Sequence, residues 1–220
     1  MGSSAHRTPL LERLYHQYLE EEDSAAFIHG VAQRYTTCTL ERLALGGERI
    51  TRRAAVLALG YIGQYESNAV LGKAMHDDDR GVRILAENGI RELWGRAGTE
   101  AQRQHLSIIV RLNSSQQYEE AIRQASELIE QAPWFAEAWN QRAIGYYQSA
   151  QYERSASDCH QALEINPYHF GAAVGMGHCY LELHDGFAAL ECFRRAIKLN
   201  PGMEDVRAQV EYLERQLEGK

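Results

Sequence analysis

Three of the four prolines in this chain, Pro133, Pro167 and Pro201, are evenly spaced along the sequence, and their surroundings recur at the same 34-residue interval. A tyrosine, for example, precedes each of the first two at the same distance, at Tyr118 and Tyr152. A fixed period of this length is typical of a stacked array, in which each repeat is a pair of helices that contacts its neighbours. Each proline should end the second helix of a pair, because it lacks a backbone N–H and keeps the preceding residue out of α geometry. The period therefore predicts an all-α solenoid.

The repeat is clearest over residues 136–169. Trp139 is followed one helical turn later by the small Ala143 and then by Tyr146, and Pro167 closes the unit. These residues resemble the signature of the tetratricopeptide repeat, in which small side chains let neighbouring helices approach closely and bulky ones fill the gaps between units. The resemblance implies a right-handed superhelix of helix pairs. The next copy keeps the pattern at Gly177, Tyr180, Ala189, Phe193, Ala196 and Pro201, whereas the first copy matches only in its second half.

Three helix pairs follow from this register. We predict them at 100–114 with 117–131, at 136–149 with 152–165, and at 170–183 with 186–199. Thr99 and Gln102 have the spacing of a capping box and should open the first pair. After the last proline, apolar residues recur at helical spacing among charges, at Val206, Val210, Leu213 and Leu217. This stretch should form a helix that closes the open end of the array.

Upstream of the first pair the chain has a shorter, 31-residue period, which relates Arg52 to Arg83. With Asp77 and Val82, these residues resemble short HEAT repeats, in which an Asp in the turn and an Arg on the following helix form a hydrogen-bonded ladder between units. The first unit has Gly46 where the Asp belongs, so the ladder should be incomplete.

The predicted organisation has four parts. N-terminal capping helices occupy residues 1–36, where amphipathic patterns run over Pro9–Glu22 and Ser24–Tyr35. HEAT-like repeats occupy 37–98, three tetratricopeptide units occupy 99–202, and the C-terminal capping helix occupies 203–220. The fold class is therefore an all-α, right-handed superhelical solenoid of HEAT-like and then tetratricopeptide helix pairs.

Composition agrees with such a chain. Hydrophobic residues make up 45%, charged residues 24%, and the net charge is −7. No stretch has the length and apolar character of a membrane span or of a secretory signal, so we expect a cytoplasmic protein without a membrane partner. Binding to nucleic acid would need a clustered basic face, whereas the nearest cluster, Arg49, Arg52 and Arg53, lies within the apolar pattern of the HEAT-like repeat.

Candidate chemistry is sparse. Cys159, Cys179 and Cys192 stand at helix positions that pack between repeats, Cys38 stands near a helix start, and no pair has the Cys-x-x-Cys spacing of a zinc or redox site. His178 adjoins Cys179, but adjacent helical residues point in different directions and do not share a metal easily. We therefore expect no catalytic residue, no cofactor and no metal.

The tetratricopeptide resemblance implies a concave groove lined by the first helix of each pair. The groove residues it implies are Leu106, Val110, Asn113, Asn140, Ile144, Tyr147, Val174, His178 and Leu181. Apolar and aromatic side chains with a few hydrogen-bonding groups suit an extended peptide or a partner helix. The class of groove that grips acidic C-termini needs Lys and Asn where this chain has Leu106, Val110 and Val174, so that ligand class is disfavoured.

These features predict a non-enzymatic protein-interaction adaptor, monomeric or weakly homo-oligomeric, whose partner is a protein or peptide. An accessory or lyase-like protein of the HEAT-repeat kind is the alternative, and it would need ligand-holding Cys, His or acidic residues that converge in the HEAT-like concavity. A self-assembling structural protein is a third possibility. The HEAT-like and the tetratricopeptide concave faces both stay open as the main binding surface.

Overall fold

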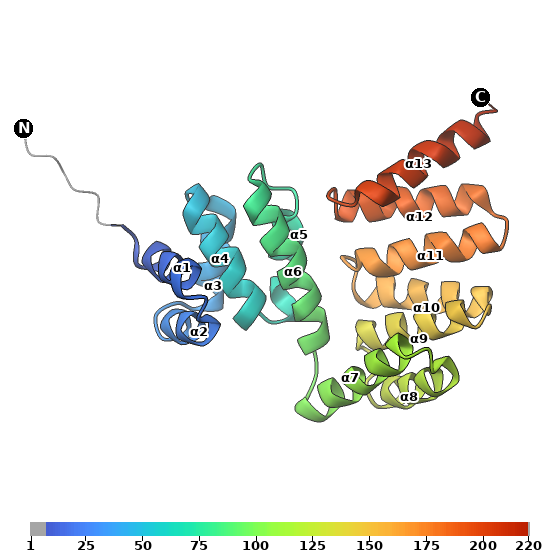
Figure 1. Ribbon diagram of the computed structural model, residues 1–220, viewed down its shortest axis with the longest axis horizontal. Coiled ribbons are helices and arrows are strands. Elements are labelled where there is room, and N and C mark those ends of the chain that lie inside the picture. Colours follow the sequence, from blue (N-terminus) through green and yellow to red (C-terminus); the bar gives the residue numbers. More distant parts are fainter. Residues whose placement is uncertain (1–7, 220) are drawn as a thin grey trace, which may run out of the picture. The chain divides into compact units, whose positions relative to one another are not determined.

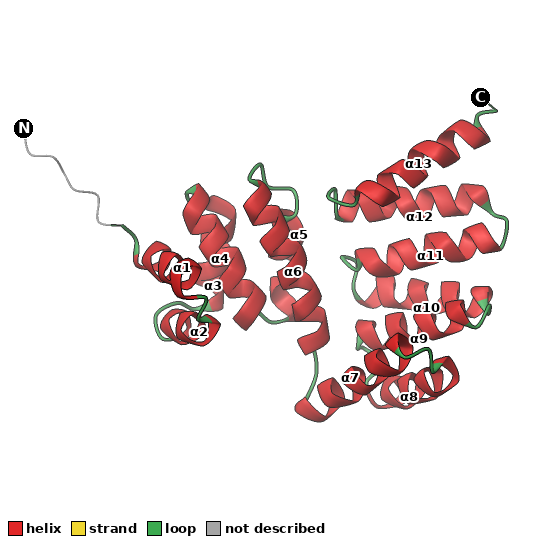
Figure 2. Ribbon diagram, in the orientation of Figure 1, coloured by secondary structure: helices red, strands yellow, loops and turns green. Residues whose placement is uncertain are grey.

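The computed structural model describes residues 8–219, and this part of the chain is built from α-helices and short loops without a strand (Figures 1 and 2). What the sequence predicts for residues 1–7 and 220 lies outside the described residues. The chain divides into two compact units, one up to Leu93 and one from Trp94 onward.

The first unit contains α1 (Leu10–Glu21), α2 (Ser24–Ala32), α3 (Thr37–Gly46), α4 (Arg49–Ile62), a 3-10 turn (Tyr65–Ser67), α5 (Asn68–Ala74) and most of α6 (Arg80–Arg96). The second unit contains α7 (Glu100–Ser114), α8 (Tyr118–Gln131), α9 (Ala136–Gln148), α10 (Tyr152–Ile165), α11 (Phe170–Glu182), α12 (Gly186–Leu199) and α13 (Glu204–Leu217). In the second unit the predicted helix limits of the three pairs agree with these within one residue.

Local signals in the sequence explain these limits. Thr99 forms the predicted capping box: its hydroxyl accepts from the amide N–H of Gln102 (3.3 Å), and the Gln102 side chain accepts from the amide of Thr99 (2.9 Å). In contrast, α2 ends at Ala32, before the predicted limit at Tyr35. The amide of Arg34 donates to the carbonyl of Val31, three residues back, and this tighter turn ends the helix early.

The second unit includes the end of α6, since it begins at Trp94. The change of repeat type between residues 98 and 99, in the loop after α6, stays a prediction. The indole ring of Trp94 stacks on His169 with 4.2 Å between ring centroids and lies 5.1 Å from the ring of Phe170. Both partners belong to the second unit.

In the first unit, two arginines of α4 hold the turn that precedes α6. Arg52 donates two hydrogen bonds of 2.7 Å to Asp77, and Arg53 donates two of 2.7 Å to Asp79. Arg52 also donates to the carbonyl of Gly47 (3.2 Å), as Arg83 does to that of Asp78 (3.0 Å). Arg52 and Arg83 are 31 residues apart, and so are the acceptors Gly47 and Asp78. The 31-residue period of the sequence therefore relates two equivalent hydrogen bonds in the structure.

A glycine contact sets how closely α4 and α6 approach. A Cβ atom placed on Gly60 would lie 3.0 Å from the Cα of Gly89, so the two backbones touch at this crossing. Only glycine at both positions leaves room for such an approach.

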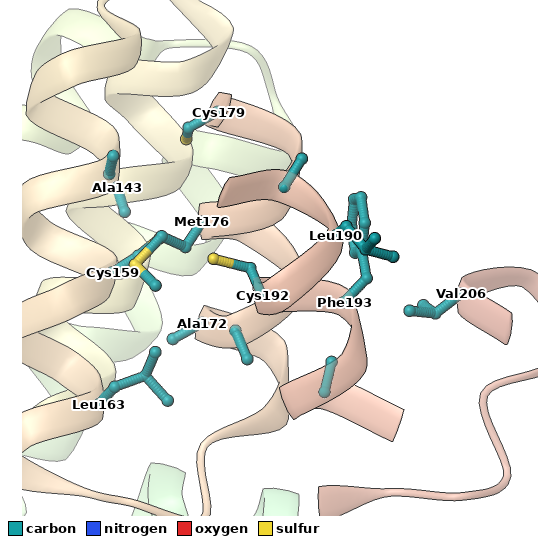
Figure 3. Packing of buried hydrophobic residues seen from close by; sticks show 14 of the residues in the cluster. Ala143, Cys159, Leu163, Ala172, Met176, Cys179, Leu190, Cys192, Phe193 and Val206 are labelled. Carbon is teal, nitrogen blue, oxygen red and sulfur yellow. The ribbon is translucent and has the colours of Figure 1, made fainter. Parts of the chain in front are cut away.

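The core of the second unit is made largely of small side chains with a few large ones between them (Figure 3). Cys159, Cys179 and Cys192 are buried within it, as predicted, and Cys38 is exposed. The thiol of Cys179 donates to the Ser155 hydroxyl (3.1 Å), which donates in turn to a backbone carbonyl of α9. The three core thiols are therefore packing residues.

At the end of this unit α13 packs against α12. It buries its predicted apolar positions, Val206, Val210 and Leu213, and leaves Leu217 partly buried. Charged residues such as Glu211 and Arg215 are exposed on it, which is the arrangement expected of a helix that closes an array.

One buried ion pair in the second unit has no signal in the sequence. Arg142 of α9 donates to both carboxylate oxygens of Asp158 on α10, at 2.7 and 2.9 Å, and to the hydroxyl of Ser126 on α8 (3.0 Å). The next repeat has Met176 and Cys192 at these two positions, and both are buried and apolar. The ion pair thus links three helices where the following copy uses apolar packing.

We predict that Asp158→Ala destabilises the second unit by about 3–5 kcal/mol, because Arg142 would keep its charge in a largely buried site without its partner. The double variant Arg142→Met with Asp158→Cys, which copies the next repeat, should recover most of that loss. Urea unfolding of both variants measures the difference. If the double variant is as unstable as Asp158→Ala, the unpaired charge of Arg142 is not the cause of the lost stability.

For the first unit we predict an acid-dependent contribution from Asp79. The hydrogen bonds from Arg53 lower the pKa of Asp79 from 3.8 to about 2. A lowered pKa in the folded state means that the carboxylate stabilises the unit fully above the ordinary pKa, and that this contribution is lost as the pH falls through about 2. Asp79→Asn should therefore lower the melting temperature at pH 7, and the difference from wild type should shrink between pH 4 and pH 2. A difference that stays constant over this range would exclude the ionised pair as its cause.

Candidate functional site

The predicted binding residues lie on α7, α9 and α11, the first helices of the three pairs. These helices are neighbours, since α9 contacts both α7 and α11. We call the surface formed by their predicted side chains the A-helix face. Because successive pairs repeat at a fixed interval along the chain, equivalent side chains on the three helices form rows across this face.

One row is apolar and exposed. Val110 and Ile144 occupy the same register position in successive repeats, and their side chains are 40% and 37% exposed. His178 continues the row on α11, half-buried, and the next step of the period reaches Tyr212 on α13, which is 55% exposed. Tyr212 is not among the predicted binding residues, because α13 was expected only to close the array, although the 34-residue period reaches this residue.

Tyr147 is more buried than the sequence predicted. Its ring packs against the core, 5.5 Å from the ring of Tyr152 and 6.4 Å from that of His178, and its hydroxyl donates to Glu182 at 3.5 Å. Burial and the nearby carboxylate raise the pKa of Tyr147. The side chain is half-buried and so presents only part of its surface to a partner.

Asn140 is held by a buried carboxylate next to it. Its amide donates to Glu137 (3.1 Å), which also accepts from Gln141 (2.8 Å) and from Nε2 of His169 (2.9 Å). The other ring nitrogen of His169 accepts from the amide of Ala172 at the start of α11, so Nε2 carries the proton. Burial alone would raise the pKa of Glu137, but these hydrogen bonds lower it overall. The group therefore ties α9 to the start of α11.

The other predicted residues differ in how much of their side chain is accessible to a partner. Leu106 is only 4% exposed and packs in the core between α7 and α8, so it does not contribute to the surface. Asn113 donates to the carbonyl and side-chain oxygens of Gln141 and thereby joins α7 to α9. Val174 and Leu181 are partly buried against the core. The accessible part of the face is thus narrower than the sequence predicted.

The predicted side chains of the A-helix face are apolar, aromatic or uncharged polar groups. Burial lowers the pKa of His178, which keeps the ring neutral near pH 7. Within the described part of the chain, no three His, Cys, Asp or Glu side chains are grouped so that they could hold a metal ion. Nor do residues 8–219 contain a helix long and apolar enough to span a membrane.

The clearest copy of the repeat, residues 136–169, matches the family model for the tetratricopeptide repeat. A curated TPR repeat-containing protein from Rhizobium etli is 27% identical over 147 residues, which cover 67% of this chain and 71% of that protein. The chain contains a tetratricopeptide repeat at residues 136–169. The matched copy runs from Ala136 to His169 and so comprises α9, α10 and the residues that lead into α11.

Solved tetratricopeptide domains share this fold. The first TPR of Spaghetti (RPAP3), bound to an HSP90 peptide, superposes with a TM-score of 0.52 at 18% identity and covers 55% of this chain and 95% of that one. The Sgt2 TPR domain from Aspergillus fumigatus superposes with a TM-score of 0.52 at 23% identity, covering 56% of this chain and 82% of that one. At these identities the likeness shows the fold, which agrees with the helix pairs predicted from the sequence.

The two aromatic residues of α9 should differ in their contribution to the stability of the tetratricopeptide unit. Trp139 is partly buried, like Tyr147, but it contacts two core clusters, and its indole N–H donates to the carbonyl of Pro133 (2.9 Å). Trp139→Ala should therefore cost about 3 kcal/mol through the cavity it leaves, whereas the half-buried Tyr147→Ala should cost about 1 kcal/mol. Chemical denaturation measures both. Equal losses would show that Tyr147 is a core residue and not part of the accessible face.

Proposed function

We propose that this protein is a non-enzymatic adaptor that binds a segment of a protein partner on the A-helix face of its tetratricopeptide repeats. The observation that supports this most directly is the exposed row formed by Val110, Ile144, His178 and Tyr212. Folding does not require apolar side chains at exposed positions, and their recurrence at one register position forms a continuous strip instead of scattered single residues.

The spacing of the row favours an extended peptide. Neighbouring packed helices lie about 8–10 Å apart, and an extended peptide in the polyproline II conformation has three residues per turn and rises about 3.1 Å per residue. Every third side chain of such a peptide points to the same side, so these side chains would meet successive members of the row. A partner helix would present its side chains at a different interval, so the extended form fits this strip better.

The chemistry of the face selects the kind of peptide. The first TPR of Spaghetti binds an HSP90 peptide that contains two glutamates and ends in an aspartate, which supports peptide binding by a fold of this kind. This chain has apolar residues, Leu106, Val110 and Val174, where the clamp for acidic C-termini needs Lys and Asn. We therefore propose a partner segment with regularly spaced apolar side chains in place of an acidic terminus.

We further propose that the first unit consists of short HEAT-like repeats. The equivalent bonds from Arg52 to Gly47 and from Arg83 to Asp78 support this assignment, and the pairing of Arg52 with Asp77 supports one step of the ladder. We also propose that the protein acts in the cytoplasm.

The test is the double variant Val110→Ser with Ile144→Ser, compared with Ile108→Ser. Ile108 also stands on α7 and is 39% exposed, but it lies outside the A-helix face, so it is a matched control. In quantitative pull-downs from the native cell, the double variant should lose partner capture by about 10-fold or more and the control should retain it. Unchanged capture by the double variant, with an unchanged melting temperature, would refute the proposed function.

A further inference from the structure

The second unit has a pocket between α12 and α13, away from the A-helix face. Figure 1 shows α13 diverging from α12 toward its C-terminal end, and the pocket, with a volume of about 270 Å³, lies between the ends of the two helices that diverge. Phe187 and Leu190 of α12 and Leu217 of α13 form its apolar wall. This volume lies just below the range of about 300–1,000 Å³ that is usual for small-molecule pockets, and it leaves room for one large side chain.

Phe187 departs from the repeat. Its side chain is 69% exposed. The two preceding copies have Glu119 and Glu153 at the same register position, and both are exposed. The fold therefore accepts a charged residue here, and the stability of the helix pair does not explain a phenylalanine. An aromatic side chain at an exposed position beside a pocket is typical of a contact with another molecule.

The rim of the pocket is acidic. Three carboxylates, Glu191, Glu214 and Glu218, line it with a single basic residue, Arg194. Arg194 donates to Glu191 (3.0 Å) and to Glu214 (2.8 Å), so one positive charge is shared between two of the three carboxylates. The rim thus has an excess of two negative charges, which attracts Lys and Arg side chains and repels Asp and Glu.

We propose that this pocket is a second docking site, for a partner segment that presents one large apolar side chain flanked by Lys or Arg. The apolar side chain packs against Phe187, Leu190 and Leu217, and the basic side chains pair with the glutamates of the rim. Because Phe187 lies on the second helix of its pair, this site is separate from the A-helix face. An adaptor with both sites holds two partner segments on one tetratricopeptide array.

The experiment uses the full chain and three synthetic peptides of equal length that share a neutral sequence. The first has a central Phe flanked by two Lys on each side, the second replaces the Lys with Glu, and the third replaces the Phe with Ser. Isothermal titration calorimetry should show binding of the first peptide alone. Raising the salt from 50 to 500 mM should weaken that binding severalfold, because the rim charges are solvent-exposed and screened.

Phe187→Glu is the decisive variant, since it restores the residue of the other two copies and should leave the melting temperature unchanged. It should weaken binding of the first peptide at least 10-fold. Val110→Ser with Ile144→Ser should leave that binding intact, which separates this site from the proposed function. Equal binding of the three peptides, or no binding of any of them, would overturn the docking site. The docking site would also be overturned if the Val110→Ser and Ile144→Ser variant lost binding of the first peptide while Phe187→Glu kept it. Sedimentation that shows a wild-type dimer abolished by Phe187→Glu would make a second copy of this chain the occupant and overturn the proposed partner class.

Discussion

The close contact between helices at small side chains is the constraint on which the second unit depends. Ala162, Ala173, Ala189 and Ala196 are fully buried, and a Cβ atom added to Gly177 would lie 2.6 Å from the ring of Phe193. With such contacts repeated from one unit to the next, each helix pair has little freedom in how it stacks on the previous one. Equivalent residues of successive pairs therefore form rows, and the row on the A-helix face is the basis of the proposed binding surface.

Departures from the repeat are as informative as the repeat itself. Arg142 and Asp158 replace an apolar contact by a buried ion pair, which links α8, α9 and α10. Phe187 replaces a glutamate at an exposed position and forms the wall of a pocket. The first change is buried and bears on stability, whereas the second is exposed and is the basis of the proposed docking site. Whether a residue that departs from the repeat is buried or exposed therefore indicates whether it affects stability or is available for contact with another molecule.

The first unit depends on contacts of a different kind. Two bidentate arginine–aspartate pairs hold the turn before α6, and a contact between two glycines lets α4 and α6 touch. Bidentate pairs of this kind fix orientation as well as adding energy, because the planar guanidinium matches the carboxylate. The 31-residue period therefore relates polar contacts in turns as well as buried apolar residues such as Leu59 and Ile90, whereas the 34-residue period of the second unit relates mainly apolar packing between helices.

The sequence by itself determined the helix limits of the second unit, the capping box at Thr99 and the burial of the three core thiols. These features depend on neighbours within a helix or on the repeat interval, both of which can be read along the chain. Only the tertiary structure decided that Leu106 is buried, that Tyr147 is half-buried against Tyr152 and Glu182, and that Arg142 meets Asp158. It also decided where α12 and α13 diverge to leave a pocket. These outcomes depend on distances between side chains of different helices, which the period of a sequence does not contain.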